Sequence, residues 1–224
     1  MKNLAIIPAR GGSKRIPRKN VKPFLGKPII AYSIESALNS GLFDYVMVST
    51  DDQEIVDTVK RYGAKAPFFR SSETSDDHTP LAEVIDEAYN QLQEKLNSSF
   101  DNICCLLPTA PMINSKKLKD SFQLLQGKDV NSVTPVVPFS YPIWRSFKLD
   151  HNNTLKMIWP EHIKSRSQDL PEVYHDAGAF YWIKTKAFLR EKSLYTRKNK
   201  AFILKVSEVQ DIDTPEDWQM AEMK

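Results

Sequence analysis

The stretch Leu4-Ala-Ile-Ile-Pro-Ala-Arg-Gly-Gly-Ser-Lys-Arg-Ile-Pro-Arg-Lys-Asn20 joins a short apolar run to a basic loop that contains two glycines. Residues 4–7 are typical of a strand that is buried on both faces of a sheet. Six basic residues and no acidic residue follow between Arg10 and Lys22. Such a local excess of positive charge is unfavourable in a compact protein unless an anion neutralises it. We therefore predict a polyphosphate-binding loop at the carboxyl end of the first strand.

Gly11 and Gly12 give this loop two positions without a Cβ atom. They let the backbone approach a ligand and permit positive φ, and successive amides in such a turn can form a nest for an anion. The loop has neither the Gly-x-x-x-x-Gly-Lys-Ser/Thr pattern of the common phosphate loop nor the Gly-x-Gly-x-x-Gly pattern of dinucleotide-binding proteins. A solvated basic turn after an edge strand is the alternative interpretation.

The composition is that of an ordinary globular chain, with 224 residues, 41% of them hydrophobic and 26% charged. This length predicts one α/β domain. Residues 1–27 hold eight basic and no acidic side chains, whereas the remainder holds 23 basic and 28 acidic ones. The excess positive charge is confined to one loop without interleaved aromatic residues, which favours a small anionic ligand over a nucleic acid.

The sequence contains no apolar stretch of the roughly 18 residues that a transmembrane helix needs. The run at residues 4–7 is also too short for a signal peptide. Cys104 and Cys105 are adjacent within an apolar run, so in a strand they would point to opposite faces and form no disulfide with each other. They indicate buried thiols in a reducing compartment. We expect a cytoplasmic protein that binds no membrane and no nucleic acid.

Strand-like and helix-like segments alternate along most of the chain. Apolar runs predict strands at residues 4–7, 45–48, 64–69, 103–107, 130–137, 178–183 and 202–206. Periodicity predicts helices at residues 28–38, 53–62, 81–96, 115–126 and 187–191 and from residue 215, with Asp51, Thr79, Ser115 and Thr214 as N-caps. The alternation predicts an α/β fold of residues 1–224 as one domain, with a mostly parallel, Rossmann-like sheet and helices on both faces.

Residues 138–174 interrupt this alternation, because they contain four prolines and show little helical periodicity. The segment nevertheless carries large apolar side chains, namely Tyr141, Trp144, Phe147 and Trp159. Such side chains on an irregular segment predict that it closes over a substrate or packs on a second subunit. We treat it as an inserted segment for dimerisation and substrate contact.

The tripeptide Asp211-Ile212-Asp213 is the second informative site. At the end of a strand, residues two apart project to the same side, so both carboxylates could converge while Ile212 packs the other way. Two carboxylates with phosphate oxygens and water suit Mg²⁺. Together with a basic loop, they would provide what nucleotidyl transfer from a metal–triphosphate requires. The alternative is that both carboxylates only cap the helix that follows Thr214.

The string Ile-Pro-Ala-Arg-Gly-Gly-Ser-Lys-Arg-x-Pro-x-Lys-Asn at residues 7–20 resembles the N-terminal signature of the CMP-sialic acid synthetase (acylneuraminate cytidylyltransferase) family. Four further motifs follow in the family's order and spacing: Ser49-Thr-Asp-Asp52, Phe69-Arg-x-x-Glu73, Pro108-Thr-x-Pro111 and Asp211-Ile-Asp-Thr214. The resemblance implies a nucleotidyltransferase fold, a homodimer, and Mg²⁺-dependent transfer of CMP from CTP to an acidic nine-carbon sugar.

The resemblance also implies roles for single residues. The nucleotide would be contacted by Ala9, Arg10, Gly11, Ser13, Lys14, Asn20, Arg70 and Thr79. The sugar would be contacted by Arg166, Gln168, His175, Asp176 and Tyr181, and an arginine suits its carboxylate. Asp211 and Asp213 would bind magnesium, and the catalytic set would be Arg10, Lys14, Arg166 and Asp213. A hydrogen-bonded turn is the alternative interpretation of the pair His175-Asp176.

Two departures bear on the sugar. Leu107 stands where sialic acid enzymes usually carry a glutamine, and Tyr174-His-Asp-Ala-Gly-Ala-Phe-Tyr-Trp182 replaces their Asn-Gly-x-x-Tyr. With Arg166-Ser-Gln-Asp169, these features resemble the branch of the family that acts on pseudaminic acid. The alternatives are legionaminic or neuraminic acid as the sugar, and a catalytically inactive nucleotide-binding or assembly protein.

Overall fold

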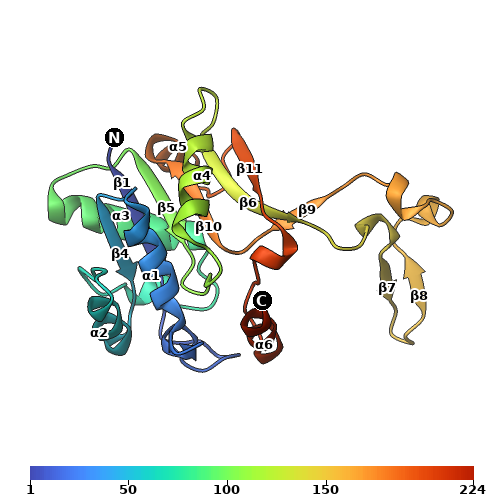
Figure 1. The fold of residues 1–224 in the computed structure, drawn as a ribbon, viewed down its shortest axis with the longest axis horizontal. Helices are drawn as coiled ribbons and strands as arrows, with labels where there is room; N and C mark the ends of the chain where they lie inside the picture. Colours follow the sequence, from blue (N-terminus) through green and yellow to red (C-terminus); the bar gives the residue numbers. More distant parts are fainter.

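The computed structural model describes residues 1–224 and has a seven-stranded sheet at its centre (Figure 1). The strand order is β11-β6-β10-β5-β1-β4, and β9 pairs with β6. The strands are β1 (Asn3–Pro8), β4 (Tyr45–Ser49), β5 (Asn102–Leu106), β6 (Ser132–Pro138), β9 (Tyr174–Asp176), β10 (Phe180–Lys184) and β11 (Asn199–Ile203). Only β9 and β10 run against the others, because β10 pairs antiparallel with β5 and β6, and β9 pairs antiparallel with β6. The predicted α/β fold with a mostly parallel sheet is confirmed.

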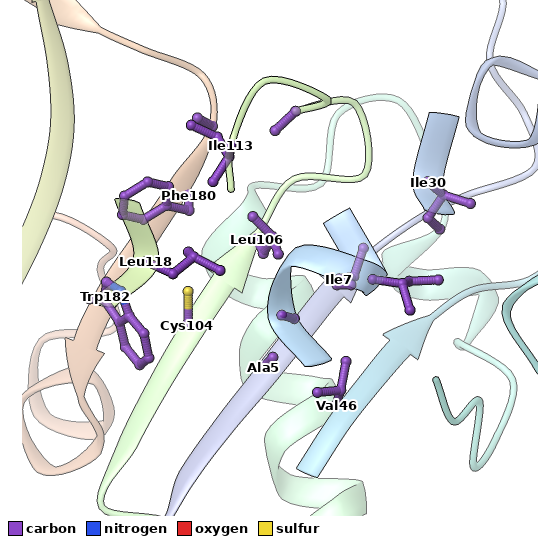
Figure 2. Close-up of a cluster of buried hydrophobic side chains, with 14 of the residues drawn as sticks. Ala5, Ile7, Ile30, Val46, Cys104, Leu106, Ile113, Leu118, Phe180 and Trp182 are labelled. Atoms are coloured by element: carbon purple, nitrogen blue, oxygen red, sulfur yellow. The ribbon is translucent and has the colours of Figure 1, made fainter. Parts of the chain in front are cut away.

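Helices cover both faces of this sheet, as predicted (Figure 1). One face packs against α1 (Ile29–Ser40), α2 (Gln53–Arg61) and α4 (Ser115–Leu125), and the other against α3 (Leu81–Leu96) and α5 (Thr185–Glu191). Successive strand residues enter opposite cores, since Cys104 belongs to the first core and Cys105 to the second. Figure 2 shows part of the first core, with Ile30 and Leu118 beside side chains of β1 and β5.

A third, smaller core joins the basic loop to the end of the chain. It contains Ile16 and Ile212 together with residues of a short hairpin, α1 and α6 (Pro215–Met223): Phe24, Ile29, Trp218 and Ala221. The hairpin consists of β2 (Pro23–Phe24) and β3 (Lys27–Pro28). Because Ile16 lies among the basic residues and Ile212 separates the two aspartates, this core brings the two predicted sites together.

Residues 138–174 extend away from the sheet (Figure 1). They contain a hairpin of β7 (Phe147–Leu149) and β8 (Leu155–Met157), and the rings of Trp144 and Trp159 lie 5.4 Å apart. None of residues 138–176 is buried, and Tyr141 is 84% exposed. The segment thus keeps its apolar side chains accessible along its whole length.

Several sequence-based boundaries were wrong. Residues 64–69 form only two isolated bridges, Lys65 with Met47 and Phe69 with Thr50. The strand predicted at residues 202–206 is β11, which begins three residues earlier, because this edge strand pairs with β6 alone and tolerates polar residues. Consequently Asp211 and Asp213 lie in a loop before α6 and not at the end of a strand.

The helix caps also differ in part from the prediction. Asp52 caps α2 in place of Asp51, and Asn114 caps α4 in place of Ser115. The side chain of Thr79 makes no capping bond to α3. The predicted N-cap Thr214 of α6 is confirmed, and Asp217 completes a capping box with it. None of the helices combines the length and apolar composition that a membrane crossing requires.

Candidate active site

A cavity of about 330 Å³ opens where β1 and β5 reach their carboxyl ends. Five cations and four carboxylates line it: Arg10, Lys14, Arg15, Lys19, Arg70, Asp76, Asp77, Asp211 and Asp213. Apolar contacts from Leu81, Val84 and Leu107 complete one side. Ligands bind in this position of open α/β sheets, beyond the carboxyl ends of parallel strands. A lining of this charge and polarity suits a small polyanion that carries a cation.

Two cations of the basic loop meet the same carboxylate. Nη1 of Arg10 lies 2.5 Å from Oδ1 of Asp77, and Lys14 forms an ion pair with the other oxygen of that residue. Hydrogen bonds from Lys14 and Arg10 hold the pKa of Asp77 below its usual range. Asp77 therefore neutralises part of the positive charge of the loop from within the chain.

The guanidinium of Arg70 is buried at the floor of the site. It donates to the hydroxyl of Ser49 at 3.1 Å and to the carbonyl of Ser49 at 2.6 Å, and it forms no ion pair. Desolvation by burial lowers its pKa. A buried cation without a paired carboxylate is costly, so Arg70 gives the cavity a strong preference for an anionic or hydrogen-bond-accepting ligand.

Asp211 and Asp213 line the same cavity from the loop before α6. Arg15 and Lys19 approach Asp213 at 2.9 and 3.4 Å. The side chain of Asp211 is accessible from the cavity, yet desolvation and the charge of Asp213 raise its pKa. Gly178 permits this placement, because a Cβ atom there would lie 3.1 Å from Cγ of Asp211.

These two carboxylates fit a magnesium ion by their chemistry. Burial and the neighbouring charge of Asp213 both raise the pKa of Asp211, so a cation shared by the two carboxylates would stabilise their charged forms. The chain offers no cluster of three or more His, Cys, Asp or Glu side chains that could hold a metal alone. Mg²⁺ at this place would therefore depend on phosphate oxygens and water for its other ligands, which is its usual way of binding in nucleotide sites.

The residues assigned to the nucleotide fall into two groups. Arg10, Ser13, Lys14, Asn20, Arg70 and Thr79 line the cavity. Ala9 and Gly11 do not, since Ala9 is fully buried and Gly11 packs on Asp52. Neither Gly11 nor Gly12 adopts the positive φ that glycine permits. A lack of space explains why residue 11 is a glycine, because a Cβ atom there would lie 2.5 Å from Oδ2 of Asp52.

The structure does not bring the residues assigned to the sugar into this cavity. Arg166 and Gln168 lie on the exposed segment, where Nε of Arg166 pairs with Asp169 at 2.6 Å. His175 packs on the ring of Phe139. Asp176 accepts hydrogen bonds from the amide of Gly178 and from the hydroxyls of two tyrosines, Tyr181 and Tyr195. Within one chain, none of these residues lines the cavity that holds the residues assigned to the nucleotide.

Sequence reasoning did not assign four of the charged lining residues, namely Arg15, Lys19, Asp76 and Asp77. The first two belong to the basic string, and their density there was the available signal. Asp76 organises its loop by accepting bonds from the amide and hydroxyl of Thr79. An acidic pair shortly after Arg70 could have indicated a partner for the basic loop, although its position opposite Arg10 depends on the fold.

Residues 4–223 match the family described as cytidylyltransferase. The chain belongs to the cytidylyltransferase family. This cytidylyltransferase is 48% identical in sequence to the pseudaminic acid cytidylyltransferase of Campylobacter jejuni subsp. jejuni serotype O:2. The alignment covers 100% of this chain and 96% of the relative. It is 32% identical to the CMP-N,N'-diacetyllegionaminic acid synthase of Legionella pneumophila subsp. pneumophila, with 99% and 95% of the two chains covered.

A solved structure supports the fold of this cytidylyltransferase. It is CMP:2-keto-3-deoxy-manno-octonic acid synthetase complexed with CTP, which superposes with a TM-score of 0.71 over 100% of this chain and 98% of the other. The two sequences are 19% identical, so the likeness concerns the fold alone. The predicted enzyme class is confirmed by the family, and the predicted nucleotidyltransferase fold is confirmed by this structure.

Proposed function

We propose that the chain transfers CMP from CTP to the anomeric hydroxyl of pseudaminic acid, which yields CMP-pseudaminic acid and pyrophosphate. The observation that carries the proposal is a single cavity that is lined by five cations and by the pair Asp211 and Asp213. The identity of 48% over the whole chain to a pseudaminic acid cytidylyltransferase supports this choice of sugar over legionaminic acid, for which the corresponding identity is 32%.

The loop cations and Arg70 account for recognition of the nucleotide. The triphosphate would replace Asp77 as the partner of Arg10 and Lys14, and these cations would then stabilise the charge on the departing pyrophosphate. Asn20 supports this geometry, because its amide donates to the carbonyl of Arg10 at 2.9 Å. Arg70 and Thr79 would face the ribose and base. Catalysis would depend mainly on positioning and charge stabilisation.

Asp211 and Asp213 would hold Mg²⁺ during the reaction. When bound, the ion supplies positive charge at the phosphorus under attack and orients the phosphate chain. Asp213 would exchange its partners Arg15 and Lys19 for the ion, and both side chains would then be free to contact phosphate.

We also propose a homodimer that forms through residues 138–174. Exposed apolar side chains on this segment support it, including Tyr141, Phe147, Leu149, Leu155 and Ile163. In a dimer, Arg166 and Gln168 of one protomer could approach the sugar in the cavity of its partner, which would reconcile their predicted role with their distance from their own cavity. Sedimentation at micromolar protein concentration tests this, and a monomeric mass would contradict it.

The two thiols support a cytoplasmic location for the enzyme, since Cys104 and Cys105 are both buried and unpaired. Burial also raises the pKa of both thiols, so neither is suited to act as a nucleophile. Immunodetection in separated cytoplasmic and membrane fractions would test the location.

The decisive experiment measures pyrophosphate release from CTP and Mg²⁺ with pseudaminic, legionaminic and neuraminic acid in turn. We expect the highest kcat/KM with pseudaminic acid and no release without a sugar. Faster turnover with another sugar would replace the proposed substrate but keep the reaction. Absence of turnover with all three would favour a nucleotide-binding protein without catalysis.

A further inference from the structure

The basic loop has a second set of contacts outside the cavity. Arg18, near the end of the loop, does not line the cavity. Its guanidinium donates to both carboxylate oxygens of Asp52, at 2.6 and 2.8 Å, and it also pairs with Glu54. Two parallel N–H bonds to one carboxylate fix orientation as well as distance. This contact therefore fixes the end of the loop against the start of α2.

The backbone of Arg18 shows that this placement is enforced. Its φ of 56° and ψ of 29° lie in the left-handed region, which is unfavourable for a residue with a Cβ atom. Such conformations persist where surrounding contacts determine them, and they concentrate at functional sites. The bonds from Arg18 to Asp52 and Glu54 are contacts of this kind.

The turn between β4 and α2 also contacts the beginning of the loop. Oδ1 of Asp51 accepts a hydrogen bond from the amide of Gly11 at 2.9 Å. Gly11 packs so closely on Asp52 that no side chain would fit between them. The turn thus holds the loop at Gly11 and at Arg18, and the cavity-lining residues Ser13, Lys14 and Arg15 lie between these two points.

We propose that Arg18 and Asp52 are positioning residues that order the intervening loop for binding of the triphosphate of CTP. The inference rests on the proposed function. A loop that is already ordered loses less entropy when it binds, so a loosened loop should bind CTP more weakly. Neither residue would touch the substrate, and binding of the sugar should be unaffected by their substitution.

The chain offers variants that separate this role from helix capping. Asp52 also caps α2, because its side chain accepts a bond from the amide of Ile55 at 3.1 Å. Asparagine caps helices as well as aspartate does, so Asp52→Asn keeps the cap and removes the charge. Arg18→Gln removes the charge of the partner. Asp57→Asn is the matched control, since this exposed carboxylate on the same helix bonds only to Gln53.

The first test measures pyrophosphate release with CTP varied and pseudaminic acid saturating. We expect the KM for CTP to rise about tenfold in Asp52→Asn and in Arg18→Gln, and the double variant to be no worse than either. The KM for the sugar should stay unchanged, and Asp57→Asn should match the wild type. An unchanged KM for CTP in the single variants, or additive losses in the double variant, would overturn the proposal.

Hydrogen exchange gives a second test that does not depend on turnover. The amide of Ser13 is hydrogen-bonded to the carbonyl of Gly11, and the amides of Lys19 and Val21 are bonded to the carbonyls of Ile16 and Arg18. They should exchange faster in Asp52→Asn than in the wild type, while the amides of α2 keep their protection. Equal exchange of the loop amides would overturn the proposal. If the wild type turned over CTP with no sugar, the proposed function would fail, and exchange would still decide whether this pair orders the loop.

Discussion

Nη2 of Arg15 lies 2.9 Å from Oδ1 of Asp213, so an ion pair between two cavity-lining residues joins the basic loop to the loop before α6. Lys19 strengthens the connection by donating to the carbonyl of Ile212 at 2.6 Å. A metal ion at Asp213 would compete with both cations. Metal binding and release of these cations toward phosphate are therefore coupled in the proposed reaction.

The substitution Asp213→Asn tests the metal assignment. It should lower kcat by at least about 100-fold, because one of two carboxylate ligands is lost at a site where the metal offsets charge in the transition state. Pyrophosphate release over a series of Mg²⁺ concentrations measures the loss, and higher Mg²⁺ should restore only part of the activity.

Asp120→Asn on α4 is a suitable control, because that carboxylate pairs with Lys116 far from the cavity. Both variants should keep the melting temperature of the wild type within a few degrees, as expected for partly exposed ion pairs. Wild-type activity of Asp213→Asn with an unchanged Mg²⁺ dependence would refute the assignment.

The ion pairs of Asp77 predict a variant with tighter nucleotide binding. Before the triphosphate can contact Arg10 and Lys14, it must displace this carboxylate. Asp77→Asn removes the competing charge, so the KM for CTP should fall about threefold to tenfold at low ionic strength, within the range of exposed ion pairs. The difference should shrink as added salt screens the charges.

Steady-state kinetics with CTP varied measures this change in KM. Asp86→Asn serves as the control, because Asp86 pairs with Lys192 at the C-terminal end of α5. A higher KM in Asp77→Asn would mean that Asp77 contributes to the bound state and does not compete with the nucleotide.

Local sequence patterns were sufficient to predict most of the strands and helices of the fold. The apolar runs that become β1 and β5 and the capping box at Thr214 each carry their information within a few residues. Residues 64–69 show the limit of such patterns, because an apolar run beside β4 forms a strand only if enough backbone pairs, and here two bridges form. The extent of an edge strand such as β11 likewise depends on its neighbour.

The charged partners within the site could not be predicted in this way. The density of positive charge in the basic loop did not indicate its partners within the chain, which are Asp52, Asp77 and Asp213 and are far apart in the sequence. Many acidic residues could have taken these places, and only the tertiary fold selects among them. Arg166 raises the further question of which protomer supplies it, and the sequence of a single chain contains no signal for that.

Leu107 offers a test of sugar selection. Its side chain lines the cavity, and its backbone is fixed by bonds to the carbonyl of Ala179 and from the hydroxyl of Ser33, both 2.8 Å long. Leu107→Gln should therefore change the side chain alone. The kcat/KM for pseudaminic acid should fall about tenfold, a typical effect of altering one pocket contact, while the KM for CTP stays constant.

Leu107→Met keeps an apolar side chain of similar size and should behave like the wild type. Pyrophosphate release with pseudaminic and neuraminic acid in both variants gives the comparison. An unchanged ratio of the two kcat/KM values in Leu107→Gln would exclude this position as a determinant of sugar choice.

The hydrogen bond between Tyr195 and Asp176 leads us to expect that the protein loses stability at alkaline pH. Burial of the phenol and its bond to Asp176 raise the pKa of Tyr195 to about 12, from an ordinary value of 10.0. The unfolded chain releases this proton near pH 10, and the folded protein holds it to higher pH. The contribution of Tyr195 to stability is therefore present below pH 10 and is lost as the pH rises toward 12.

Tyr195→Phe removes this group and should flatten the decline of the unfolding free energy between pH 10 and 12 by no more than about 1 kcal/mol, because the ring is half exposed and solvent screens the charge. Denaturant unfolding at several pH values measures the difference. In Asp176→Asn the absorbance of tyrosinate should appear at lower pH, since the negative charge that opposes ionisation is gone. If the unfolding free energy declined equally between pH 10 and 12 in the wild type, Tyr195→Phe and Asp176→Asn, then Asp176 would not control the ionisation of Tyr195.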